Sequence, residues 1–490
     1  MSARLPIIYV RGFAGGQGAI DDAVNDPFYG FNEGSVHVRV GANGTPRYYQ
    51  YEGPLVRLMR EQNYQLRVEG SQQSVLLEAE TETLPPDAIW IYRFYDAATA
   101  SFDAPPQPYQ IDKASKGLAD FIALVREKTI GAPPVYLVAH SMGGLICRTA
   151  LQREIPDPTA SVSKLCTIGT PHGGVNPELG GPIGGWIIDR LGPQGSQIFS
   201  PNHMRDYMFP VDKNRPDDWD PRRMVGGFTA DRVLSIVGTN ARDYDVALGL
   251  SSALMGVQSD GLVAIRNAYV VGSARAYIHR SHSGRFGLVN SEEAYQNLKR
   301  FLFGALRVEV GLVGLHFDDE RVWQAEVRLA IRGLPVLMHE QTADHYCPVD
   351  LNAEAAKIST PMSPLPLITV FLIPNPRNVA RYALDLKVTS LRENGGMFGF
   401  GEHLEQVGDW QDALIVEVVV GDDGIASSIE WEWNSTLSER PGSATLANTL
   451  DWADERDGSG RPSPRMPLPA VAAKLLGADA GLEMAVRRWT

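Results

Sequence analysis

Short apolar runs alternate with helix-like stretches over the first 305 residues of this chain, and this alternation constrains the fold more than any other feature. It is typical of an α/β fold in which helices cover a mostly parallel β-sheet. The predicted strands are residues 7–10, 89–94, 135–139, 165–168, 234–237 and 276–279.

Helical spacing is clearest in two places. Apolar residues recur every three or four positions between 111 and 125, which predicts an amphipathic helix. A second helix is predicted over residues 291–303, with Asn290 as its N-cap and Glu293 at its third position.

The pattern changes after about residue 305. Runs rich in Val, Ile and Leu follow one another with turn residues between them, at 308–313, 322–331, 367–372, 382–388 and 414–420, and helical periodicity returns only at about 470–486. A chain of 490 residues also exceeds what one hydrophobic core usually organises. We therefore predict two domains, an α/β domain over 1–305 and a β-rich, sandwich-like domain over 306–490.

Charge and hydropathy exclude several classes of protein. The net charge of −13 disfavours nucleic acid and anionic membrane surfaces as partners. No window approaches the ~18 apolar residues of a transmembrane segment. The first residues carry no recognisable secretory signal, and three scattered cysteines do not form a disulfide framework, so we expect a cytoplasmic location.

The segment 133–148 carries the strongest functional signal. An apolar strand runs into a tight turn containing Ser141 and then into a helix, which is the context that a nucleophilic serine at a strand-to-helix turn requires. Ala139 and Gly143, two residues before and after the serine, are small enough for a sharp turn. A structural turn with an incidental serine is the alternative.

Two motifs give this region a family resemblance. Residues 139–144, Ala-His-Ser-Met-Gly-Gly, resemble the nucleophile elbow of lipases and esterases of the α/β-hydrolase fold, and residues 168–174 resemble the Gly-Thr-Pro-His stretch of that group. The resemblance covers about residues 5–305. It implies a serine ester hydrolase that acts on a small-molecule or lipid ester and needs no cofactor.

The acid and the base are sought after the nucleophile, because the order in this fold is serine, acid, histidine. Asp260 begins an Asp-Gly-Leu-Val segment that resembles the one carrying the lipase acid; Asp243 and Asp245 are rivals because they follow the preceding strand more closely. His282 is favoured as the base over His279, which lies nearer the strand.

The oxyanion hole is assigned to two backbone amides. One is the N–H of Met142, directly after the nucleophile. The other is the N–H of Phe13, in a Gly-rich loop that resembles the lipase His-Gly-Phe-Gly pattern, with Arg11 where histidine is commoner. The structural alternative for this loop is a flexible turn.

An insertion at about 174–228 is long enough to cover the site. Its apolar helical faces suggest substrate contacts from Trp186, Ile187, Met204 and Met208. A mobile lid and an ordinary pair of packing helices both remain open.

No metal site is predicted. An acidic cluster, Asp212, Asp217, Asp218 and Asp220, has no spacing typical of calcium loops and is interpreted as a solvated face. His339, His345 and Cys347 lack a fourth zinc ligand.

Other functions stay open on the same residues. An acyltransferase, a phospholipase A, an amidase or a polyester hydrolase would use the same triad, and a binding protein on a degenerate hydrolase scaffold would use none of it. The β-rich domain is open to contact with a lipid surface, carbohydrate binding, assembly or simple support.

Overall fold

The structure is a computed structural model that describes residues 4–13, 17–26, 28–29, 35–40, 45–67, 72–96, 110–175, 199–211, 213–242, 258–284, 287–317, 321–352, 364–394, 403–440, 445–450 and 465–489. The chain divides into two compact units. The first contains Met1–Arg275 and His279–Leu298, and the second contains Ala276–Ile278 and Lys299–Thr490.

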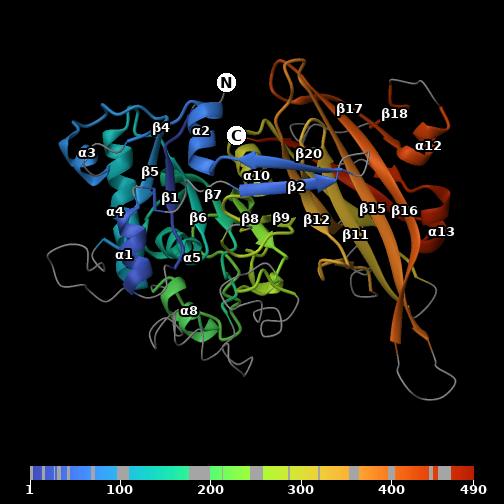
Figure 1. Ribbon diagram of the computed structural model, residues 1–490, viewed down its shortest axis with the longest axis horizontal. Helices are drawn as coiled ribbons and strands as arrows, with labels where there is room; N and C mark the ends of the chain where they lie inside the picture. Colours follow the sequence, from blue (N-terminus) through green and yellow to red (C-terminus); the bar gives the residue numbers. More distant parts are fainter. Residues whose placement is uncertain are drawn as a thin grey trace. The chain divides into compact units, whose positions relative to one another are not determined.

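A seven-stranded sheet organises the first unit (Figure 1). Its order is β4 (Gln65–Leu66), β5 (Ala88–Tyr92), β1 (Ile7–Val10), β6 (Val135–His140), β7 (Val162–Ile168), β8 (Val233–Gly238) and β9 (Ala274–Ile278). The pairings from β4 through β8 are parallel. The six predicted strands are all present, and their continuous burial explains why they read as uninterrupted apolar runs. The predicted α/β fold is confirmed.

Helices connect these strands. They are α1 (Gln17–Asn25), α2 (Pro54–Gln62), α3 (Gln72–Glu78), α4 (Ile111–Lys128), α5 (Met142–Thr149) with a π-helical turn at Ala150–Glu154, α6 (Pro158–Ser161), α8 (Pro201–Met208) and α10 (Glu292–Phe303). Helix α4 buries the apolar stripe that predicted it. Strands β2 (Ser35–Val40) and β3 (Pro46–Tyr51) form a separate antiparallel pair.

The start of α10 corrects one prediction. The Ser291 hydroxyl accepts the backbone N–H of Ala294 at 3.1 Å, so Ser291 and not Asn290 caps the helix. The Glu293 carboxylate is held by Arg280 instead of folding back on the cap. None of the helices in the described part of the chain has the length and hydropathy that a membrane span needs.

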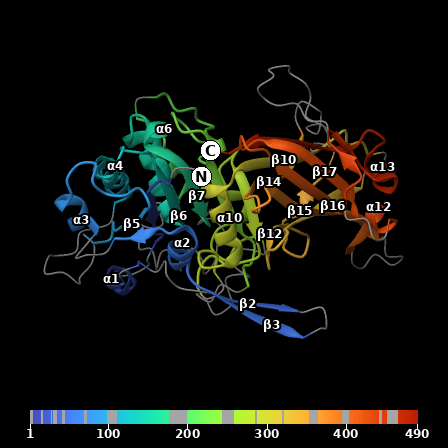
Figure 2. The same ribbon diagram turned by 90° about the horizontal axis from the view of Figure 1, so that it is seen from above.

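Two antiparallel sheets build the second unit, which confirms the predicted β-rich character (Figure 2). The four-stranded sheet has the order β14 (Leu365–Leu372), β10 (Leu306–Val313), β20 (Gly481–Arg488) and β19 (Arg465–Pro467). The larger sheet has the order β12 (Leu337–Gln341), β11 (Val322–Ile331), β15 (Val379–Asn394), β16 (His403–Val420), β17 (Ala426–Trp433) and β18 (Asn448–Thr449), with β13 (Val349–Asp350) paired to β11.

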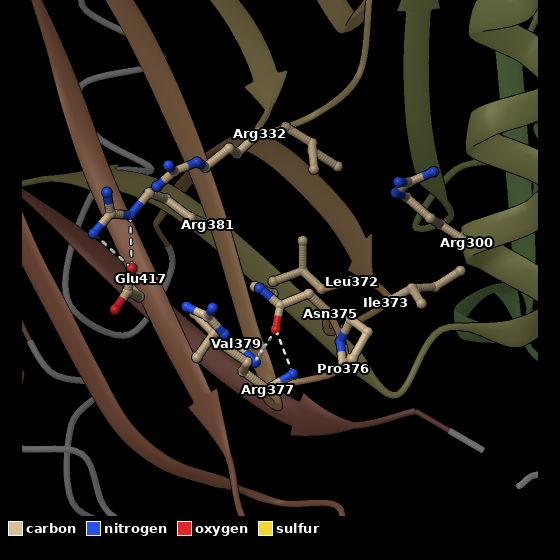
Figure 3. A pocket seen from close by; sticks show the side chains of 12 residues that line it. Arg300, Arg332, Leu372, Ile373, Asn375, Pro376, Arg377, Val379, Arg381 and Glu417 are labelled. Atoms are coloured by element: carbon tan, nitrogen blue, oxygen red, sulfur yellow. Dashed lines mark hydrogen bonds and ion pairs between the residues drawn. The ribbon is translucent and has the colours of Figure 1, made fainter.

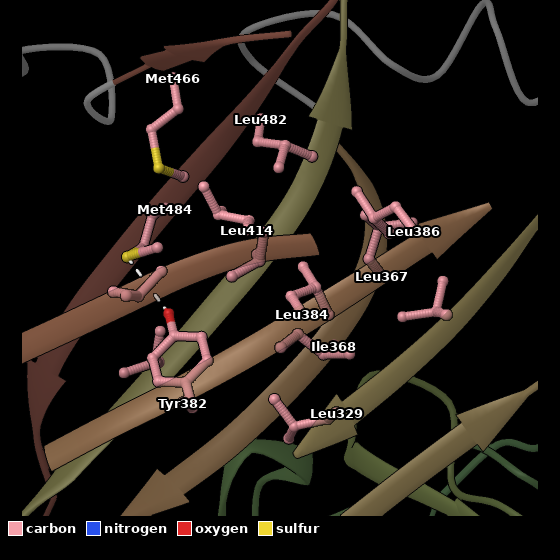
Figure 4. Close-up of a cluster of buried hydrophobic side chains, with 14 of the residues drawn as sticks. Leu329, Leu367, Ile368, Tyr382, Leu384, Leu386, Leu414, Met466, Leu482 and Met484 are labelled. Carbon is pink, nitrogen blue, oxygen red and sulfur yellow. Dashed lines mark hydrogen bonds between the residues drawn. The ribbon is translucent and has the colours of Figure 1, made fainter. Parts of the chain in front are cut away.

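One continuous apolar core joins these sheets (Figure 4). Alternate residues of β15, including Tyr382, Leu384 and Leu386, are buried, as expected for strands with one face on the core. From the other sheet come Leu482 and Met484, and the Tyr382 hydroxyl donates to the Met484 sulfur at 3.6 Å.

The helix predicted at 470–486 is wrong in its second half. Helix α13 (Ala470–Leu476) ends at Gly477, whose φ of 113° is a conformation that favours glycine. The chain then forms β20, which pairs with β10 on one side and β19 on the other. Pairing on both sides outweighed the local helical spacing.

Candidate active site

A sharp turn presents Ser141 between β6 and α5. Its backbone has φ 52° and ψ −127°, a conformation that costs a non-glycine residue of order 1–3 kcal/mol. The turn is tied to the sheet because the Ser141 N–H donates to the Ile168 carbonyl of β7 at 2.9 Å. Ser141 is only 5% exposed.

Close packing explains the small residues around this serine. A Cβ at Gly143 would lie 2.3 Å from the carbonyl oxygen of Val10 in β1. A Cβ at Gly144 would lie 2.2 Å from the Thr170 hydroxyl oxygen. Ala139, two residues before the serine, is fully buried. The helix therefore starts against the end of β1.

The structure brings Ser141, His282 and Asp260 together. The His282 Nε2 atom lies 2.9 Å from Ser141 Oγ, and its Nδ1 atom lies 2.8 Å from Asp260 Oδ2. Because a carboxylate only accepts hydrogen bonds, Nδ1 carries the ring proton and donates it to Asp260. The Nε2 lone pair then accepts the Ser141 hydroxyl. All three side chains are buried.

Backbone donors fix the Asp260 carboxylate. Its second oxygen, Oδ1, accepts the N–H groups of Leu262 at 3.0 Å and Val263 at 2.7 Å. The Asp260 carbonyl also accepts the His282 N–H at 2.8 Å, which joins the two loops. Both carboxylate oxygens thus have defined partners, and the imidazole has one preferred orientation.

His140 contacts the backbone of His282. Its Nε2 atom lies 3.1 Å from the His282 carbonyl oxygen, which can only accept, so Nε2 carries a proton. Burial, followed by the neighbouring His282 ring, lowers the pKa of His140 to about 3, and the ring is neutral at pH 7. His140 is therefore a positioning group.

An ion pair that the sequence did not reveal anchors the loop of His282. The Arg280 guanidinium donates to the Glu293 carboxylate of α10 at 3.0 Å, and both side chains are only 9% exposed. Arg280, a charged residue between an apolar strand and a candidate base, is the signal that could have indicated this ion pair. The rival His279 is exposed and contacts Thr239 Oγ1 at 3.2 Å.

The loop after β1 lies against the turn that contains Ser141. A Cβ at Gly12 would lie 2.6 Å from Ser141 Cβ, so the backbone there approaches the serine as closely as glycine allows. Phe13 follows directly and is half-buried. Met142 opens helix α5 on the other side of the serine. The two segments assigned to the oxyanion hole are thereby adjacent to Ser141.

A buried hydrogen-bond network connects helix α5 with the turn after β7. Arg148 Nη1 donates to His172 Nδ1 at 3.3 Å, so His172 Nε2 carries the proton and donates to Thr167 Oγ1 at 3.0 Å. Burial lowers the pKa of Arg148 to about 9 and holds that of His172 well below its usual range. His172 thus takes part in a structural network.

Helix α8 carries two of the predicted substrate contacts. Met204 and Met208 are fully buried, and the Met208 carbonyl accepts the Gln152 side-chain amide at 2.8 Å. Their contact with substrate stays a prediction. Trp186 and Ile187 lie outside the described residues.

The two rivals of Asp260 and one residue of the acidic cluster lie outside the described residues. These are Asp243, Asp245 and Asp212, whereas Asp217 and Asp218 are exposed. Asp220 pairs with Arg222 at 2.8 Å. In the described part of the chain, no group of three or more His, Cys, Asp or Glu side chains is arranged to hold a metal ion.

Comparison with solved structures gives distant matches. Phospholipase PlaB from Legionella pneumophila is 11% identical with a TM-score of 0.35, covering 80% of this chain and 87% of that chain. The metagenomic carboxyl esterase MGS0156 is 14% identical with a TM-score of 0.31, covering 60% and 72%. The lin2722 gene product of Listeria innocua is 16% identical with a TM-score of 0.28, covering 61% and 94%.

Comparison with curated proteins finds no match. A model of the family described as "alpha/beta hydrolase fold" does match, over residues 98–363, which is more than half of the chain. Together with the parallel sheet, this match shows that the chain belongs to the α/β hydrolase fold family and is a hydrolase.

Proposed function

We propose that this hydrolase is a serine carboxylic-ester hydrolase that works through an acyl-enzyme. The observation that carries the proposal is the unbroken hydrogen-bonded series from Ser141 Oγ through His282 to Asp260, at 2.9 and 2.8 Å. A serine hydroxyl is a weak nucleophile, and a base held by a carboxylate is what activates it.

In the first step Ser141 Oγ attacks the ester carbonyl carbon while His282 Nε2 takes the hydroxyl proton. Asp260 stabilises the imidazolium that forms. The tetrahedral intermediate collapses when the carbon–oxygen bond to the alcohol breaks and His282 gives its proton to the leaving oxygen. The alcohol departs and an acyl-Ser141 ester remains.

The N–H groups of Met142 and Phe13 are assigned to stabilise the negative charge that forms on the former carbonyl oxygen. Support comes from the close approach of Gly12 to Ser141, which brings the loop after β1 to the serine. One donor of this kind contributes about 10²–10³ in rate.

In the second step His282 takes a proton from water, and the resulting hydroxide attacks the acyl carbon. The bond to Ser141 breaks, His282 returns a proton to Oγ, and the carboxylic acid leaves. Only side chains, backbone amides and water take part, so the proposed reaction requires no cofactor.

The test replaces the nucleophile and the base. Ser141→Ala and His282→Gln should each lower turnover of a p-nitrophenyl ester by roughly 10⁴-fold or more. His279→Gln is the matched control, because this exposed histidine lies three residues from His282 and should leave turnover unchanged. Turnover near the wild-type value in Ser141→Ala would refute the mechanism.

A fluorophosphonate probe separates the proposal from the binding-protein alternative, since only an activated serine is labelled. A chain-length series of esters, with added alcohols and with phospholipid and amide substrates, then separates esterase or lipase activity from acyltransferase, phospholipase A and amidase activity. The proposed substrate class is a small-molecule or lipid ester.

A further inference from the structure

A pocket of about 560 Å³ lies within the second unit (Figure 3). Arg300, from the last part of α10 that belongs to this unit, contributes one side. The end of β11, the turn between β14 and β15, and β16 contribute the rest. Its volume falls within the ~300–1,000 Å³ of small-molecule sites. None of its lining residues belongs to the site around Ser141.

The pocket gathers positive charge in an acidic protein. Its lining includes four arginines, Arg300, Arg332, Arg377 and Arg381, and a single carboxylate, Glu417, although the net charge of the chain is −13. Arg300 on α10 is only 9% exposed. Concentrated like charge opposes folding, so such a cluster is typical of a site for an anion.

The carboxylate neutralises only one of these arginines. Glu417 lies opposite Arg381 in the register of β15 and β16, and the two side chains form an ion pair at 2.6 Å. Arg332 sits on the other side of Arg381, where its N–H donates to the Arg381 carbonyl at 3.0 Å. The Arg381–Glu417 ion pair therefore has the guanidinium of Arg332 as a further positive charge beside it.

Arg332 and Arg377 are available to a ligand. Both are exposed, and neither side chain has an ion pair with any residue in the part of the chain that the structure describes. Asn375 adds a neutral donor, because its side-chain oxygen accepts the N–H groups of Arg377 at 2.8 Å and Val379 at 3.2 Å and its NH₂ group is left over. Figure 3 shows Asn375 between the arginines.

We propose that this pocket binds a phosphate group carried on a small organic moiety. Guanidinium forks match phosphate oxygens in pairs, and several cations suit a dianionic phosphate better than a single carboxylate. The volume exceeds what the phosphate alone needs, and Leu372, Ile373 and Pro376 offer an apolar wall to the attached carbon chain. A soluble phosphate ester and the head group of a phospholipid share this chemistry.

The experiment measures binding of glycerol 3-phosphate to the full-length protein by calorimetry. Arg332→Gln and Arg377→Gln should each weaken binding by about tenfold or more, the loss expected for one charge-assisted hydrogen bond. Arg488→Gln is the matched control, because Arg488 is exposed on β20, outside the pocket lining, and loses the same charge. Thermal melts establish that each variant is folded.

A second variant tests the same site in the opposite direction. Glu417→Gln removes the only carboxylate and frees Arg381, so binding should become severalfold tighter, with a steeper loss on adding salt. Absence of glycerol 3-phosphate and vesicle binding by the wild-type protein, or equal affinities in Arg377→Gln and the wild type, would overturn the proposal.

Vesicles identify the source of the phosphate. Vesicles of phosphatidylcholine with phosphatidic acid are compared with vesicles of phosphatidylcholine alone by co-sedimentation. Sedimentation that requires phosphatidic acid and is lost in Arg332→Gln assigns the pocket to a lipid head group. Binding of glycerol 3-phosphate without such sedimentation assigns it to a soluble phosphate ester. The Arg332→Gln comparison separates either outcome from binding of an ester at Ser141, because Arg332 lines the pocket and not the site around Ser141.

Discussion

Replacing Asp260 with asparagine changes one atom of a fully buried carboxylate, and the surroundings of that atom determine the result. The side-chain oxygen of asparagine should remain at the Oδ1 position, because two backbone N–H groups point at it there. The NH₂ group then faces His282 Nδ1. Two donors cannot share one hydrogen bond, so the imidazole must place its proton on Nε2 instead.

This tautomer removes the base from the proposed reaction. With a proton on Nε2, His282 can no longer accept the hydroxyl proton of Ser141, although the 2.9 Å distance between the two atoms is kept. For this kind of change in a Ser-His-Asp triad we expect kcat to fall by ~10⁴. At about 1.4 kcal/mol for each tenfold change, the activation free energy rises by about 5 kcal/mol.

The assay is hydrolysis of a p-nitrophenyl ester, with a thermal melt to establish folding. Asp217→Asn is the control, because it makes the same chemical change at an exposed position. Retention of activity within about tenfold of the wild type in folded Asp260→Asn would mean that Asp260 does not set the tautomer of His282, and the assigned triad would be wrong.

Three further predictions concern stability. Gly143→Ala should lower the free energy of unfolding by about 1–3 kcal/mol, because its Cβ would lie 2.3 Å from a carbonyl oxygen of β1. Gly18→Ala, whose Cβ would meet nothing within 4 Å, should leave that free energy unchanged, and urea denaturation measures both variants. Glu293→Gln should cost about 3 kcal/mol in the same measurement, since it leaves the buried Arg280 guanidinium without its carboxylate. Between pH 6.5 and 3 the His140 ring takes up a proton when the chain unfolds but not while it is folded, so stability falls as the pH falls. His140→Gln should therefore lose about 2 kcal/mol less than the wild type between pH 7 and pH 5, and equal losses would contradict the assigned buried, neutral ring.

The strands of the parallel sheet could be predicted because both of their faces are buried. Residues 7–10 and 135–139 are short, continuous apolar runs of the kind typical of strands buried on both faces. The β2–β3 pair was missed although Val36, Val38 and Val40 alternate with polar residues, a period-two signal that would have found it.

The second half of the 470–486 prediction failed for a different reason. Apolar residues recur there at a spacing that fits a helix, but β20 is flanked by β10 and β19 and gains backbone hydrogen bonds on both edges. Only the tertiary structure supplies those partners. Gly477, where α13 ends, is the one local sign of the break.

The candidate site was predictable where chemistry depends on short motifs and unpredictable where it depends on distant partners. Glycines close to Ser141 and Asp260 in the sequence, Gly143 and Gly261, indicate the turns in which the two residues lie. The hydrogen bond between His140 and the His282 carbonyl joins residues 142 positions apart, and no local pattern around either residue predicts the other. The sequence favours His282 over His279 through its position in the loop, and the end of β9 at Ile278, directly before His279, agrees with that preference.

The order of strands in the sheet accounts for how the site assembles. Strand β1 lies beside β6, so the loop after β1 meets the turn at Ser141, and Gly12 permits their contact. Strands β7 and β8 follow. Gly169 comes directly after β7, and a Cβ there would lie 3.3 Å from His282 Nδ1; Gly238 ends β8, and a Cβ there would lie 2.7 Å from Asp260 Cβ. The segments that the proposed mechanism uses therefore meet at one edge of the sheet. Their order there follows the order of the strands, with the oxyanion-hole loop after β1, Ser141 after β6, and the contacts to His282 and Asp260 at the ends of β7 and β8. The loops that follow β1, β6, β8 and β9 bring Phe13, Ser141, Asp260 and His282 to this edge, as is typical of open α/β sheets, whose sites lie beyond the carboxyl ends of the strands.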